Sequence, residues 1–83
     1  MRLTRLEERD GVFIVAFERE KSDAGNIYYG FIQGIPGLER EELPDGQGWK
    51  VVGTLENERR LGSLFPDFQH RLLTLRKQLS LFS

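Results

Sequence analysis

Side chains that act as nucleophiles, acids or metal ligands are few and scattered along this chain. His70 is the only histidine, and the sequence contains no cysteine. A serine hydrolase would need His70 beside an activated serine, but the signature G-x-S-x-G does not occur. We therefore interpret the isolated histidine as a surface residue and predict no catalytic residue.

The carboxylates and glycines also lack the spacing of a ligand site. The acidic groups at 7–10 and 39–42 do not follow the pattern of oxygen ligands in a calcium loop. Without cysteine there is no thiolate-bound zinc. Neither phosphate-binding pattern, G-x-x-x-x-G-K-[ST] or G-x-G-x-x-G, occurs. We expect no metal ion, no cofactor and no enzymatic activity.

The most specific pattern lies at the C-terminal end, Gln78-Leu79-Ser80-Leu81-Phe82. It resembles the short peptide with which many bacterial replication and repair proteins bind the DNA polymerase sliding clamp. The resemblance implies that Gln78 enters a small polar-edged pocket and that Leu79, Leu81 and Phe82 fill apolar subsites. Ser80 stands where the motif accepts a small or acidic residue. This hypothesis predicts a free tail that frays from the preceding helix near Gln78.

The same tail also continues an apolar stripe, which supports a second interpretation. The stripe recurs every three or four residues, as on one face of a helix, at Phe65, Phe68, Leu72, Leu75 and Leu79. It would then belong to the core, or pair with its copy in a homodimer, and Leu79 and Phe82 would be buried. A Leu-rich amphipathic helix produces a five-residue match easily, so both interpretations stay open.

The elements that position these residues follow from hydrophobic periodicity. Strands are predicted at 3–8, 12–17, 27–35, 38–43 and 49–55. Asp10-Gly11 has the composition of a two-residue hairpin turn. The strand at 12–17 is apolar on both faces, so we expect it to be central and covered on both sides. Pro66 predicts a break near Phe65 in the helical region that follows.

These elements predict an α+β fold. Short connections favour an antiparallel meander of four or five strands, with a C-terminal amphipathic helix packed on one face. A small β-barrel plus a helix is the alternative. The 83 residues suit a single domain, divided into the meander (1–55), a helical region (56–77) and the tail (78–83). So short a chain has a thin core, which oligomerisation would enlarge.

Aromatic residues on the predicted sheet suggest a third interpretation, single-stranded nucleic-acid binding. Tyr28, Tyr29, Phe31 and Trp49 would stack bases, and four strands followed by a helix are similar to the unit of PUR-type single-stranded DNA binders. The net charge of −1 and the acidic 1–55 half, seven Lys/Arg against ten Asp/Glu, oppose phosphate contact. Aromatic residues in strands are also more often core.

We therefore predict a small, non-enzymatic binding or adaptor protein. The leading hypothesis is tethering to the bacterial sliding clamp, in DNA replication or repair, through the tail. The alternatives are a module that dimerises through its C-terminal helix and a single-stranded nucleic-acid binder. No apolar run approaches the roughly 20 residues that span a membrane, and the N-terminus lacks the apolar core of a signal peptide. We expect a cytoplasmic location.

Overall fold

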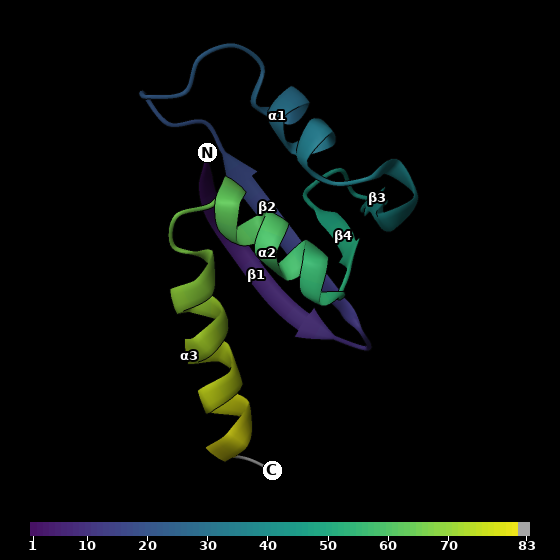
Figure 1. Cartoon of the computed structure of the whole chain (residues 1–83), viewed down its shortest axis with the longest axis vertical. Helices are drawn as coiled ribbons and strands as arrows, with labels where there is room; N and C mark the ends of the chain where they lie inside the picture. Colours follow the sequence, from purple (N-terminus) through teal and green to yellow (C-terminus); the bar gives the residue numbers. More distant parts are fainter. Residues whose placement is uncertain (82–83) are drawn as a thin grey trace.

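The computed structural model describes the backbone of residues 1–81 and the side chains of residues 1–79. Within this part of the chain, four strands, three α-helices and one short 3-10 helix follow one another (Figure 1). Their bounds are β1 Arg2–Arg9, β2 Val12–Glu18, α1 Ile27–Gly34, η1 Gly37–Glu39, β3 Arg40–Glu42, β4 Trp49–Val52, α2 Leu55–Leu64 and α3 Phe68–Leu81. The predicted α+β class is confirmed.

The described strands form one open antiparallel sheet with the order β1-β2-β4-β3. Asp10 and Gly11 make the predicted hairpin turn, with positive φ angles of 52° and 77°. β2 then pairs with β4 rather than β3, and the Gly53 N–H donates to the Gly11 carbonyl at 2.8 Å. The meander is therefore interrupted after β2, and the barrel alternative is wrong because β1 and β3 remain free edges.

The segment predicted as a strand at 27–35 is a helix, α1. Asn26 caps it, because its Oδ1 accepts a hydrogen bond from the Tyr28 N–H at 2.9 Å. Gly30 and Gly34 lie one helical turn apart and let other chain segments approach: a Cβ on Gly34 would come 2.9 Å from Leu64 Cδ1. The strand prediction was wrong because β-propensity gives way to capping and tertiary packing.

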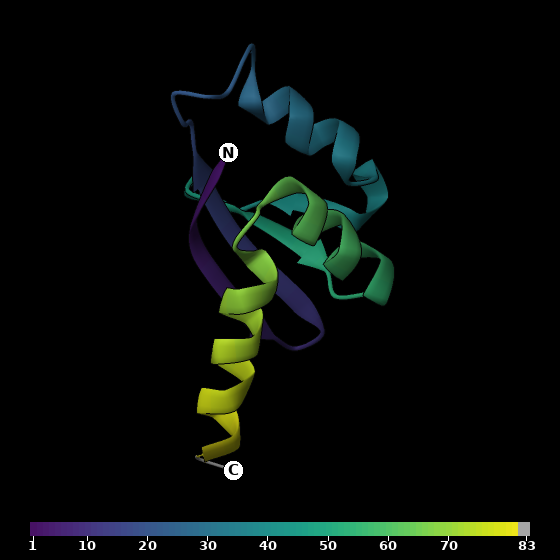
Figure 2. The same cartoon turned by 60° about the vertical axis from the view of Figure 1, so that its left-hand side comes forward.

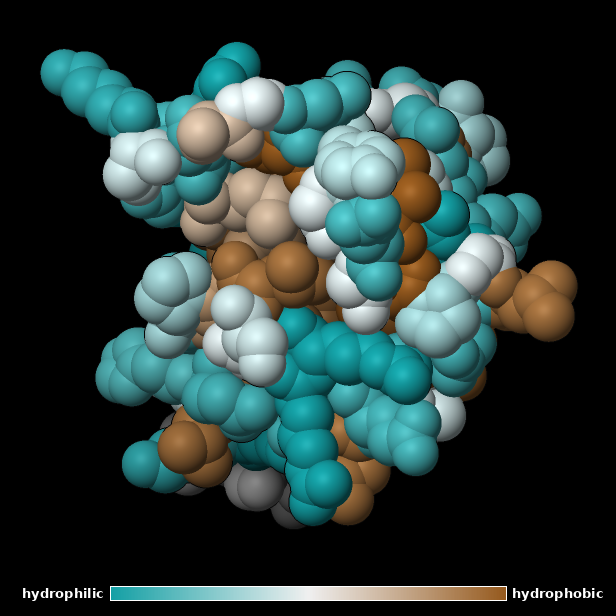
Figure 3. Space-filling view, turned by 45° about the horizontal axis from the view of Figure 1, so that its top comes forward, coloured by the Kyte–Doolittle hydropathy of each residue, from teal (hydrophilic) through white to brown (hydrophobic). Residues whose placement is uncertain are grey.

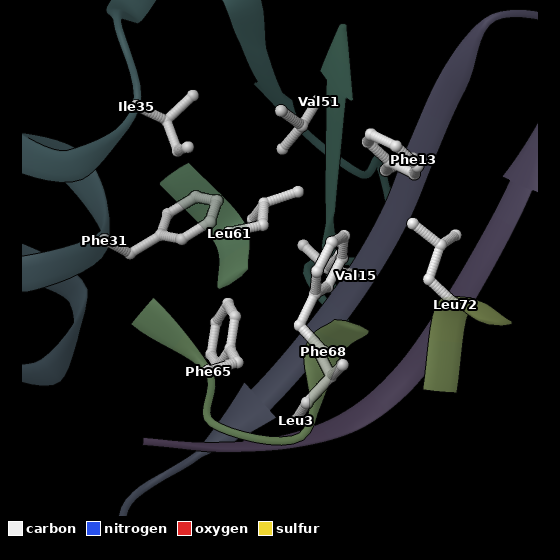
Figure 4. Packing of buried hydrophobic residues seen from close by; sticks show 10 residues of the cluster. All are labelled: Leu3, Phe13, Val15, Phe31, Ile35, Val51, Leu61, Phe65, Phe68 and Leu72. Carbon is white, nitrogen blue, oxygen red and sulfur yellow. The ribbon is translucent and has the colours of Figure 1, made fainter. Parts of the chain in front are cut away.

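All three described helices pack into one core against one face of the sheet. Its buried members are Leu3, Phe13, Val15, Phe31, Ile35, Val51, Leu61, Phe65, Phe68 and Leu72 (Figure 4). They come from the strands and helices alike, and Figure 2 shows α2 and α3 in front of the strands. β2 is an interior strand, as predicted, but described helices cover only its Phe13 and Val15 side; on its other side Ile14 is 8% exposed without a helix above it.

The helical region is divided where the sequence predicts. α2 ends at Leu64 and α3 begins at Phe68, so Pro66 lies in the break between them. The acidic segment 38–43 contains the short edge strand β3, also as predicted. No helix in the described chain is both long and apolar enough to cross a membrane. Figure 3 shows apolar atoms reaching the surface among hydrophilic side chains.

Candidate interaction surface at the end of helix α3

Two arginines hold α3 against the sheet and α2. The Arg71 Nη1 donates to the Leu3 carbonyl at 2.5 Å, which places this guanidinium at the free edge of β1. Arg76 pairs with Glu8 of β1 at 2.9 Å and with Glu58 of α2 at 3.2 Å. Sequence reasoning missed both arginines, because their partners lie 68 and 18 residues away along the chain.

The Arg76 contacts also set the electrostatics of this region. Hydrogen bonds from Arg76 lower the pKa of Glu8 below its usual value, and the same contact raises the pKa of Arg76. On the outer side of β1, hydrogen bonds from Arg9 and Arg5 lower the pKa of Glu7. The β1 carboxylates are therefore ionised partners of arginines and not proton donors for catalysis near neutral pH.

Burial decreases steadily along the apolar stripe of α3. Phe68 is fully buried and Leu72 is 1% exposed, whereas Leu75 is partly buried and Leu79 is 53% exposed. The Phe68 ring meets Phe13 edge-on, with centroids 5.7 Å apart. Phe65, in the α2–α3 connection, is also fully buried. The first part of the stripe is thus core, and it is not available for a dimer interface through this helix.

The last turn of α3 agrees with neither prediction made for the tail. The helix continues through Leu81, so no fraying begins at Gln78. Leu79 is half exposed, so it does not complete the core. The Ser80 and Leu81 side chains, and all of Phe82, lie outside the described residues. What the described part offers is an apolar side chain on a helix end that projects from the domain (Figure 1).

A shallow groove separates this helix from the free edge of β1. It has a volume of about 350 Å³ and is lined by Leu6, His70, Arg71, Thr74, Leu75 and Gln78. The exposed His70 is therefore beside Arg71 and not beside a serine or a carboxylate lining the same groove. In the described chain, no three His, Asp or Glu side chains gather in a way that would hold a metal ion.

The four predicted stacking residues do not form one exposed platform. Tyr28, Tyr29 and Phe31 belong to α1, not to the sheet, and Phe31 is fully buried 5.2 Å from the Trp49 ring. Tyr29 is exposed, and its hydroxyl accepts a hydrogen bond from Gln33 Nε2 at 2.7 Å. Tyr28 and Trp49 line a hollow of about 200 Å³ beside the 46–48 loop. The aromatic residues serve mainly the core and its margin.

Sequence reasoning also missed a buried polar residue, Asn57. It is fully buried at the start of α2, where its N–H bonds the Thr54 hydroxyl at 3.1 Å. Its side chain donates to the Val52 carbonyl at 2.9 Å and accepts from Arg60 Nη1 at 2.8 Å. These polar atoms are satisfied within the domain, so Asn57 fixes α2 against β4 and is not a binding residue.

Comparisons with protein-family models, with curated proteins and with solved structures find no significant match to this chain. The features of this chain that bear on function are therefore the geometry of α3 and the resemblance of its last residues to a clamp-binding peptide.

Proposed function

We propose that this protein is an adaptor that docks on a protein partner, the bacterial sliding clamp, through Gln78–Phe82. The observation that carries the proposal is the burial contrast within α3. Phe68 and Leu72 are buried and pack the helix against the domain, whereas Leu79, in the same apolar stripe, is 53% exposed. An exposed leucine in a sequence that resembles a clamp-binding peptide is available to a partner at little cost to the fold.

Binding as an extended peptide would require the last turn of α3 to open. Helix ends open at a much lower free energy than the core, because their carbonyls lack partners further along the helix. Gln78 lines the groove beside β1 and Leu79 is exposed, so opening this turn exposes no buried core residue of the described chain. The last turn of α3, which follows Lys77, is therefore a suitable docking segment.

The expected affinity is modest. Burying three apolar side chains contributes roughly 1.5–3 kcal/mol each, and the lost freedom of the tail and of the complex offsets much of this. The apolar contacts are therefore expected to give binding no tighter than a micromolar dissociation constant, about −8 kcal/mol. Such binding suits a reversible tether, and a second contact would strengthen it through effective concentration.

The proposal is tested by calorimetric titration of purified bacterial sliding clamp with the full chain. We expect micromolar binding, which is lost in a chain ending at Lys77 and reduced at least about tenfold by Leu79→Ala. Leu73→Ala is the matched control, because Leu73 is a leucine of α3 with similar exposure, 57%, outside the motif. No binding by the full chain, or equal losses in both leucine variants, would contradict the proposal.

A further inference from the structure

The face of the sheet opposite the helices carries apolar side chains that no described helix covers. The pairing register places Val12 of β2 opposite Val52 of β4 on this face, and Ile14 opposite Lys50. The helices pack against the other face, where Phe13, Val15 and Val51 are buried. Ile14, at the centre of this face, is only 8% exposed, whereas the surface toward β3 stays open at Val52, which is 40% exposed.

Apolar side chains gather at one end of this open face. Val52 is 40% exposed, and Leu38, just before β3, is fully exposed. A hollow of about 140 Å³ lies among them, lined by Val12, Leu38, Glu39, Arg40, Glu41, Lys50 and Val52. The patch therefore offers a projecting leucine directly beside a hollow with two valines. A surface that has a projecting side chain next to a hollow is suited to a self-complementary contact between two copies.

The charges around the patch are complementary under a two-fold axis. Glu41 of β3 and Lys50 of β4 are directly opposite each other in the register, and both are exposed. Consider a two-fold axis that runs parallel to these strands, above the open face and midway between them. It places Glu41 of each copy over Lys50 of the other copy. The same rotation carries Leu38 from the β3 side across to Val52 of the partner. Opposite charges meet, and each leucine faces a hollow.

We propose that a second copy of this chain covers the open face in a two-fold dimer centred between β3 and β4. The remaining charges of the open face already have partners: Arg2 pairs with Glu18, and Glu7 pairs with both Arg5 and Arg9. The contact joins two folded domains through a small patch, so the dimer is reversible and concentration-dependent. It leaves α3 of each copy on the outer, helical layer, and it does not depend on the proposed clamp binding.

Light scattering coupled to size-exclusion chromatography tests the dimer over a micromolar to millimolar concentration series. We expect the mass to rise from 9.6 kDa toward twice that value. Leu38→Lys should raise the dimer dissociation constant at least about tenfold, and it leaves folding intact because this side chain is fully exposed. Leu73→Lys, on α3, is the control and should not change the dissociation constant.

A charge exchange tests the two-fold geometry itself. Glu41→Lys and Lys50→Glu should each weaken the dimer, because each brings like charges together across the axis, and the double exchange should restore it. A chain that stays monomeric at millimolar concentration would overturn the proposal. The proposal would also be overturned if the Leu38→Lys chain dimerises as well as the parent, or if the double-exchange variant dimerises no more strongly than the single variants.

Discussion

The two ends of helix α3 have the same kind of apolar side chains in different surroundings. Near its start, Phe68 and Leu72 are enclosed by the sheet and α2, and Arg71 adds a hydrogen bond to the edge of β1. Near its end, Leu79 is 53% exposed. One periodic stripe therefore serves two purposes: its first half holds the domain together, and its last turn is left for other contacts.

The largest expected effect comes from removing a buried ring at the start of α3. Phe68→Ala should lower the free energy of unfolding by about 3–5 kcal/mol, because it leaves a cavity and removes the edge-on contact with Phe13. The total free energy of unfolding of a domain of this size is only about 4–12 kcal/mol. Leu73→Ala, exposed on the same helix, should change stability by less than about 0.5 kcal/mol in urea unfolding. Similar losses in both variants would contradict the division of the helix.

A smaller effect is expected from the arginine at the sheet edge. Arg71→Ala removes the hydrogen bond to the Leu3 carbonyl and should cost about 1–2 kcal/mol. Lys77→Ala, an exposed cation later in α3, is the control and should be nearly neutral. Urea unfolding of the three chains measures the difference. If Arg71→Ala is as neutral as Lys77→Ala, the carbonyl contact does not anchor α3.

A still smaller effect concerns Arg76 and the acid sensitivity of the fold. Because Arg76 lowers the pKa of Glu8 in the folded state, the unfolded state takes up the proton more readily. The stabilisation is therefore complete above the ordinary glutamate value of about 4.3 and is lost as the pH falls through the lower folded pKa.

Arg76→Gln should lower stability at neutral pH by at most about 1 kcal/mol, since both side chains are partly exposed to screening water. It should also make the loss of stability in acid smaller. Urea unfolding across a pH series measures both effects, with the exposed Arg59→Gln as the control. A variant whose stability falls in acid as steeply as that of the parent would show that Arg76 does not lower the Glu8 pKa.

Sequence reasoning predicted those features that depend on local chemistry. The positive-φ turn at Asp10-Gly11, the interruption at Pro66 and the acidic edge strand each follow from the residues themselves. It failed at 27–35, where Ile27, Phe31 and Ile35 recur with a helical spacing after the capping residue Asn26, a signal that the β-branched and aromatic residues obscured.

The candidate site was less predictable, because its features arise from tertiary contacts. The stripe of α3 is regular in sequence, and only the position of β1 and α2 decides where its burial ends. Nothing local distinguishes Leu72, which is 1% exposed, from Leu79, which is 53% exposed. In the same way, the apolar patterning of β2 predicted cover on both faces, whereas the described helices supply it on one.

The division of α3 is tested most directly by the free energy of unfolding of a chain that ends at Lys77, compared with that of the full chain. We predict a difference of less than about 1 kcal/mol, because the removed turn contributes no buried side chain among those described. A loss of several kcal/mol, comparable to that of Phe68→Ala, would place the tail in the core and contradict its role as a docking segment.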